Sequence, residues 1–207
     1  MRPLAAISTQ QAGGREHPGL NAAGALMVTI SSMPTSDGGQ ATVWDLSQRV
    51  SVGSIGDDVS LVQYLMVRFA MVRVKADPAG VAAFGLAIGE VDGIWGPKTA
   101  AAMAWLERSN TGDPNAGGQG GFLADGAVDP FPAGVEFYNH GPLQLGYKMC
   151  GLQELYCAGI SHLPSNAIPA QQFSDIVMGM PNDGLCPPSL ANTLLQLQAQ
   201  VPVAGSS

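Results

Sequence analysis

The sequence predicts a mainly α-helical protein in which a short β element is followed by two related helical units, with extended arms at the ends of the chain. Three observations predict this class. Apolar residues recur at helical spacing in several segments. Two β-prone runs flank a cluster of turn residues early in the chain. One pattern of sequence recurs about 90 residues further on.

The N-terminal segment, residues 1–48, is expected to form an arm that ends in a short β hairpin. Its first half is polar and rich in small residues, which is typical of an extended tail. Apolar, β-prone runs at 26–30 and 41–44 flank the sequence Pro-Thr-Ser-Asp-Gly-Gly at 34–39. Such a cluster of turn residues between two β-prone runs favours a hairpin.

Residues 49–110 form the first expected unit. Apolar residues at three-to-four spacing follow Gly56 and two aspartates, whose carboxylates suit a helix N-terminus. This helix is expected to end before Pro78, and residues of about 70–90 are expected to be an insertion. A second helix is expected over 98–108, because Pro97 suits the first position of a helix. Its inner face comprises Thr99, Ala102, Met103 and Leu106.

The second half of the chain is expected to contain a linker and a second unit. Residues 111–140 are rich in glycine and proline, as in a linker. Residues 141–202 carry apolar patterns typical of helices at 143–160, 169–178 and 189–201. These helices would form the second, degenerate unit.

The two units share two blocks of residues. In the first block, a glycine, a glutamine and a leucine coincide; in the second, an Asp-Gly pair, a proline and an alanine coincide. The separation of the blocks is nearly the same in both units, which favours duplication over coincidence between two Gly- and Pro-rich helical segments. The glutamine and the Asp-Gly pair are Gln63 with Asp92-Gly93 in the first unit and Gln153 with Asp183-Gly184 in the second.

The block at 91–102, Val-Asp-Gly-Ile-Trp-Gly-Pro-Lys-Thr-Ala-Ala-Ala, together with the glycine-started helix before it, resembles the peptidoglycan-binding-like domain family. Members are small three-helix modules often attached to cell-wall hydrolases and bacteriophage lysins. The resemblance covers about residues 50–110, apart from the insertion, and it extends weakly to about 141–201. It implies a three-helix fold for each unit and a wall-binding or docking surface. The candidate binding residues that it implies are Asp92, Gly93, Trp95, Gly96, Pro97 and Thr99.

These candidates also have structural roles that any such turn would need. Gly93 can take a positive φ, Gly96 and Pro97 can set the direction of the next helix, and Thr99 can cap it. Trp95 can either fill the core or offer a platform for a sugar. In the second unit Cys186 stands at the position of Trp95. The second copy therefore lacks the aromatic side chain of the first.

Charge excludes some partners and leaves two interpretations of the surface open. The net charge is −7, with nine Lys and Arg against sixteen Asp and Glu, and the basic residues are scattered. We therefore expect no nucleic-acid binding. Charged residues make up only 12% of the chain, so either much of its exterior is buried against partners or it has an uncharged polar surface. No stretch is long and apolar enough for a membrane span, and no signal peptide is recognisable, so we expect synthesis in a bacterial cytoplasm.

Nothing in the sequence indicates an enzyme, and we expect no catalytic residues, no metal and no cofactor. The histidines form no close pair, and no glycine-rich segment has the context of a phosphate-binding loop. Cys150 and Cys157 would share a helix face, and with Cys186 and His162 they could form a metal site. The ordinary interpretation of these cysteines is that they are small buried hydrophobic residues.

Together these features predict a non-catalytic structural or adaptor protein of a large assembly, such as a bacteriophage virion. It would be a tail or capsid-associated component that docks through a peptidoglycan-binding-like module. Its partners would be other subunits of the assembly. Direct binding to cell-wall peptidoglycan is the alternative, and a lysin or other hydrolase is the third hypothesis.

Overall fold

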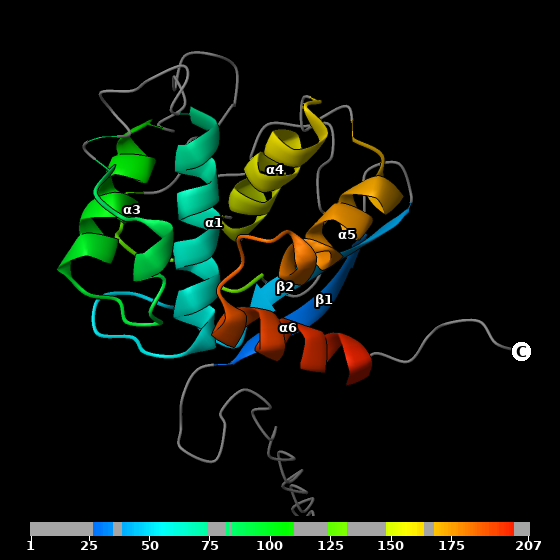
Figure 1. Ribbon diagram of the computed structural model, residues 1–207, viewed down its shortest axis with the longest axis horizontal. Coiled ribbons are helices and arrows are strands. Elements are labelled where there is room, and N and C mark those ends of the chain that lie inside the picture. The colour runs from blue at the N-terminus through cyan, green and yellow to red at the C-terminus, as the bar shows by residue number, and fades with distance from the viewer. Residues whose placement is uncertain are drawn as a thin grey trace, which may run out of the picture.

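A computed structural model describes the chain over residues 27–34, 39–73, 82, 84–109, 124–131, 148–163 and 168–200. In chain order these ranges hold a β hairpin, two long helices with a short 3-10 helix between them, and three further helices (Figure 1). The mainly helical class and the N-terminal hairpin are confirmed. The expected arm at 1–24, most of the insertion, and residues 111–123 and 132–140 of the expected linker lie outside the described residues. Linker residues 124–131 are described, and Val128 there forms a β-bridge with Val50.

The hairpin consists of β1 (Val28–Pro34) and β2 (Gln40–Leu46), which pair antiparallel. The register places Val28 opposite Leu46 and Ile30 opposite Trp44. Residues of β2 are buried on both faces, because α5 packs against this strand and Trp44 lies in the core.

Side chains close the outer edge of β2. The amide N–H of Thr42 donates to Ser174 Oγ at 2.9 Å. Gln153 Oε1 accepts from the Trp44 amide N–H at 3.1 Å, and its Nε2 donates to the Trp44 carbonyl at 2.9 Å. An open edge of a two-stranded sheet would leave these backbone groups without partners, so helices α4 and α5 complete the hairpin.

Helix α1 (Asp57–Arg73) lies at the centre of the molecule, between α3 and α4 (Figure 1). Its middle is buried on every side; Leu61, Tyr64 and Leu65, for example, have no exposed surface. A helix that is apolar all round is expected only where neighbours surround it. Its two aspartates contact other segments: Asp58 accepts bonds from the amide and hydroxyl of Ser47, and Asp57 accepts one from Thr193 Oγ1.

Helix α3 (Pro97–Ser109) begins at the proline that predicted it. Its buried face contains the four residues expected there. Trp105 joins them and makes tilted or edge contacts with Phe69 and Phe84. Burial of these aromatic rings fixes α3 against α1.

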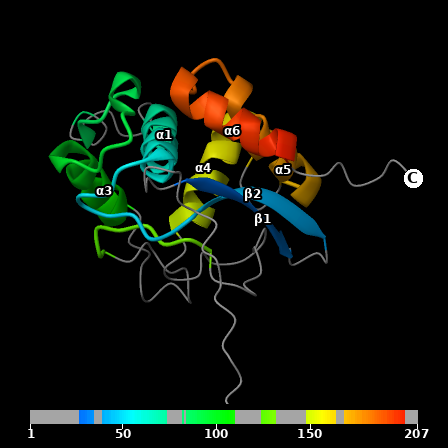
Figure 2. The same cartoon turned by 90° about the horizontal axis from the view of Figure 1, so that it is seen from below.

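The last three helices are α4 (Lys148–Ser161), α5 (Ala170–Met178) and α6 (Pro188–Gln200). Residues 143–147, expected to be helical, lie outside the described ranges. Helices α5 and α6 lie on the same side of the hairpin (Figure 2). Buried residues from both strands and all five helices form one continuous core. The first expected unit contributes α1 and α3, and the second contributes α4, α5 and α6; their relation as two three-helix units stays a prediction.

Candidate functional site

The first Asp-Gly turn connects the 3-10 helix η1 (Ile88–Glu90) to α3. Gly93 takes a φ of 74°, and Asp92 Oδ1 accepts a bond from the Ile94 amide at 2.9 Å. An aspartate that bonds the amide two residues ahead stabilises a tight turn, and the following glycine takes a conformation that other residues adopt at a cost.

Gln63 of α1 holds this turn from inside. Its side chain is 1% exposed. Its Oε1 accepts from the amides of Asp92 at 3.1 Å and Gly93 at 3.0 Å. Its Nε2 lies 3.0 Å from Asp92 Oδ1, 3.1 Å from the Ile94 carbonyl and 2.9 Å from Thr99 Oγ1. One buried amide therefore fixes both sides of the turn and the start of α3.

The loop that precedes α1 pairs with the other side of the turn. Backbone bonds join Gly53 to Trp95, Trp95 to Ser54, and Gly56 to Gly93, at 2.9–3.1 Å. Trp95 is 1% exposed. Its indole therefore lies in the core, and it offers no surface on which a sugar could stack.

A polar groove runs along the outer side of the turn, with a volume of about 380 Å³. Its walls include Glu90 and Lys98, which form an ion pair, and the carboxylate of Asp92. The Lys98 ammonium lowers the pKa of Glu90. Burial alone would raise the pKa of Asp92, but bonds from Gln63 and the Ile94 amide hold it below its usual value. Both carboxylates are therefore ionised at neutral pH.

Three exposed aliphatic side chains come from this turn and from the loop that pairs with it, and one of them, Ile94, lines the groove. Val52 is 71% exposed, Ile55 59% and Ile94 49%. Ile55 and Ile94 face each other across an isolated β-bridge. Isolated exposed aliphatic residues are common on protein surfaces, but a group of β-branched residues around one turn suggests an interaction site. We call Val52, Ile55 and Ile94 the aliphatic patch.

The structure brings the six predicted binding residues to one turn but gives them different exposure. Asp92 and Pro97 are exposed and Gly96 is half-buried; Gly93, Trp95 and Thr99 are buried. Sequence reasoning missed the aliphatic patch and the pair of Glu90 and Lys98. The available signal was the presence of Val52 and Ile55 in a Ser- and Gly-rich loop, where apolar residues have no helical or strand pattern to explain them.

The second Asp-Gly turn has the same local backbone. Gly184 takes a φ of 77°, and Asp183 Oδ1 accepts from the amides of Leu185 at 2.9 Å and Cys186 at 3.0 Å. The 3-10 helix η3 (Met180–Asn182) precedes this turn, and α6 follows it from Pro188. Both turns thus connect a 3-10 helix to a helix of 13 residues that starts at a proline.

The surroundings of the two turns differ. Asp183 Oδ2 accepts from the hydroxyl of Tyr64, from the hydroxyl of Tyr156 at 2.9 Å and from Arg68 Nη1 at 2.9 Å. Burial alone would raise the pKa of Asp183, but the hydrogen bonds from these donors and from the Leu185 amide hold the pKa below its usual value. Gln153, the counterpart of Gln63, bonds β2 instead of this turn. The second turn is therefore fixed onto α1 and α4, and its carboxylate is occupied.

The cysteines are free thiols. Cys150 Sγ lies 3.7 Å from Glu154 Oε1, and Cys157 Sγ lies 3.8 Å from the Phe173 carbonyl. Burial raises the pKa of all three thiols, that of Cys186 to about 12. Within the described ranges, no three His, Cys, Asp or Glu side chains are grouped as metal ligands, and no helix is long and apolar enough to cross a membrane.

Comparison of the chain with protein-family models, with curated proteins and with solved structures found no match. The resemblance of residues 50–110 to the peptidoglycan-binding-like family therefore stays a prediction from the motif.

Proposed function

We propose that this chain is a non-catalytic structural or adaptor protein of a large assembly, such as the tail or capsid of a bacteriophage particle. In this proposal the first Asp-Gly turn, with its groove and the aliphatic patch, docks another protein of the assembly. The second turn acts as scaffold.

The observation that carries this proposal is the exposed aliphatic patch beside a groove with charges of both signs. Protein interfaces commonly combine an apolar centre with a polar rim. Here Ile55 and Ile94 would supply apolar contact, while Asp92 and Lys98 would supply charged partners at the edge. Asp92 Oδ2 has no partner among the described residues and remains available to a cation or N–H donor from outside.

The contrast between the two turns supports assigning docking to the first. A carboxylate bound by two tyrosine hydroxyls and an arginine has little capacity left for a further partner. Asp183 is in that position, whereas Asp92 lies exposed at the groove. Arg68 and Asp183 are also largely buried, with side chains 12% and 11% exposed. The second turn thus stabilises the fold rather than offering a surface.

Direct binding to peptidoglycan is the second candidate, and the polar groove favours it. Stem peptides carry carboxylates and amines that could bond Lys98 and Asp92. Glycan strands are commonly held by exposed aromatic rings, whereas the exposed large hydrophobic side chains of the described residues include no aromatic one. This distribution favours a protein partner over a glycan strand.

The test compares the wild-type chain with the Ile55→Asp variant in two assays. Cells that produce the chain are lysed, and particles are separated by density-gradient sedimentation; separately, the purified chain is incubated with peptidoglycan sacculi. We expect wild type to sediment with particles, the variant to remain in the soluble fractions, and neither to be retained on sacculi. Retention of wild type on sacculi without particle association would overturn the proposal in favour of wall binding. Clearing of a peptidoglycan zymogram would overturn the non-catalytic assignment.

A further inference from the structure

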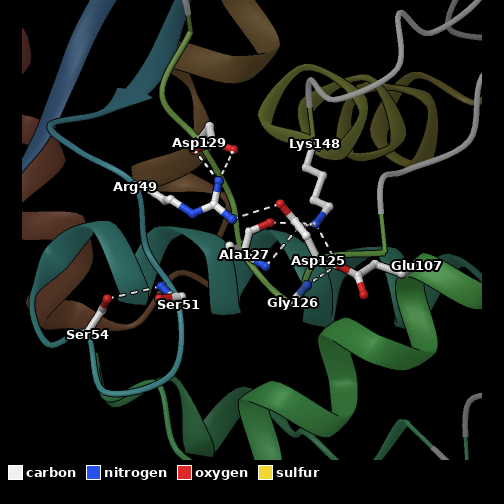
Figure 3. A network of polar contacts seen from close by, with 9 residues as sticks. All are labelled: Arg49, Ser51, Ser54, Glu107, Asp125, Gly126, Ala127, Asp129 and Lys148. Atoms are coloured by element: carbon white, nitrogen blue, oxygen red, sulfur yellow. Dashed lines mark hydrogen bonds and ion pairs between the residues drawn. The ribbon is translucent and has the colours of Figure 1, made fainter.

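A buried lysine starts helix α4, beside two carboxylates from other segments. The Lys148 side chain is 2% exposed. Its Nζ lies 2.5 Å from Glu107 Oε1 of α3, and it also donates to Asp125 Oδ1 and to the Ala127 carbonyl (Figure 3). The three donors of the amine are thus directed at three protein oxygens.

The two oxygens of Asp125 have different surroundings. Oδ1 faces Lys148 and accepts from the Ala127 amide at 3.2 Å. Oδ2 accepts from Arg49 Nη2 at 2.8 Å, and Arg49 is itself held by Asp129 at 2.9 Å (Figure 3). Because the carboxyl carbon is one bond from Oδ1, it lies in contact range of the Lys148 amine.

Glu107 lies against the amine and against the backbone of Gly126, the residue after Asp125, where it can carry a proton. Its side chain is 5% exposed. Its Oε1 accepts from Lys148 and from the Gly126 amide at 2.9 Å, so the carboxylate is fixed beside the amine. An amine and a carboxyl group are the reactants of amide formation, a cation on one carboxyl oxygen stabilises the charge that develops there, and a second carboxylate can carry the protons.

We propose that Lys148 and Asp125 condense to form an intramolecular isopeptide bond, with Glu107 as the proton carrier. The ammonium first gives a proton to Asp125 Oδ1, which leaves a neutral amine beside a neutral carboxyl group. Nζ then attacks the carboxyl carbon, and the negative charge develops on Oδ2.

Arg49 stabilises that oxyanion from its position on Oδ2. Glu107 takes a second proton from Nζ and passes it to the Oδ1 hydroxyl. The bond from carbon to Oδ1 breaks, one water leaves and the carbonyl re-forms at Oδ2. Of the three protons on Nζ, one stays on the amide and two leave with the water, so the step needs no oxidant or co-reactant.

Two physical effects favour this condensation over a permanent ion pair. Groups held in contact react with effective molarities on the order of 10⁵–10⁸ M, which accelerates a condensation that is very slow between free groups in water. Burial of a charged pair is also costly, and condensation replaces one buried cation and one carboxylate by a neutral amide. The product would join the start of α4 to the segment 124–131.

The test is the intact mass of the folded, full-length wild-type chain, measured after denaturation. We expect a mass lower than that of the sequence by about 18 Da, one water, and a branched peptide joining Asp125 to Lys148 after proteolysis. The Glu107→Gln and Lys148→Arg variants should have the full mass. Asp125→Asn should lose ammonia, about 17 Da, instead of water.

The control separates this bond from succinimide formation, which also releases water at Asp-Gly sequences such as Asp125-Gly126. A succinimide does not need Lys148, so a water loss that persists in Lys148→Arg would overturn the proposal. The proposal would also be overturned if the wild-type chain is folded by circular dichroism and still has the full mass of its sequence. Lys148, Asp125 and Glu107 would then form an ion-pair network only. The wild-type measurement decides the question even if a variant fails to fold.

Discussion

Replacing each turn glycine by alanine should separate the energetics of the two Asp-Gly turns. Gly93 and Gly184 have nearly the same positive φ, 74° and 77°. An alanine in this left-handed region costs about 1–2 kcal/mol at either position. A Cβ at Gly184 would meet nothing within 4 Å. The predicted loss of unfolding free energy for Gly184→Ala is therefore about 1–2 kcal/mol.

Gly93→Ala should cost more because space at this turn is filled. The added Cβ would lie 2.8 Å from Ser60 Oγ and 3.1 Å from the Gly56 carbonyl oxygen. That oxygen accepts bonds from the first turn of α1, so it cannot move without loosening the helix start. Overpacking adds about 1–3 kcal/mol, for a total of about 2–5 kcal/mol.

Urea unfolding is measured for both variants and for wild type, and the midpoints are compared on the condition that the m-value is unchanged. The prediction is a midpoint shift at Gly93→Ala clearly larger than at Gly184→Ala. Equal shifts, or a larger shift at Gly184→Ala, would refute the reasoning, because the strain in φ is common to both and only the packing differs.

The buried polar groups of Gln63, Arg68 and Asp58 can each be tested by substitution. Gln63→Leu should lower the unfolding free energy by about 3–5 kcal/mol, because it leaves buried N–H and C=O groups without partners. The control Gln171→Leu, on the exposed face of α5, should change the unfolding free energy by less than about 0.5 kcal/mol. Arg68→Met should cost about 2–4 kcal/mol by leaving the carboxylate of Asp183 without its cation, and adding Asp183→Asn should recover part of that loss. Burial raises the pKa of Asp58 from 3.8 to about 7. The folded state therefore keeps a proton that the unfolded state releases, and stability should fall by up to about 4 kcal/mol as pH rises from about 4 to 7, a fall that Asp58→Asn should reduce.

Each of these predictions has an outcome that contradicts it. If Gln63→Leu and Gln171→Leu have equal midpoints of thermal unfolding, the hydrogen bonds of Gln63 do not contribute the predicted stability. An additive double variant would show that Arg68 and Asp183 are not coupled. If Asp58→Asn has the same pH dependence as wild type between pH 4 and 7, the proton is held elsewhere, for example on Glu154, whose pKa burial also raises to about 7.

Local signals predicted much of the secondary structure. Pro97 and Pro188 each mark the first residue of a helix, because proline lacks the N–H that a helix start leaves unpaired. The hairpin followed from two β-prone runs with a turn cluster between them. These features depend on residues close together in sequence, so a single chain suffices to find them.

Contacts between distant segments could not be predicted. Asp183 bonds Tyr64, which lies 119 positions away, and Lys148 bonds Glu107, which lies 41 positions away. The aligned glutamines Gln63 and Gln153 have different partners because one faces its own turn and the other faces β2. The similarity of the two sequence blocks predicts the same role for both glutamines, and only the tertiary packing around each one determines its actual partners.

The proposed association with an assembly through the first turn is tested most directly by a matched pair of substitutions. Ile94 and Leu185 both follow an Asp-Gly pair and are 49% and 40% exposed. The measurement is the fraction of each variant that sediments with particles, with folding checked by circular dichroism. We predict that Ile94→Asp loses most of this association and that Leu185→Asp keeps it. Equal association of the two folded variants, or selective loss by Leu185→Asp, would contradict the assignment of docking to the first turn.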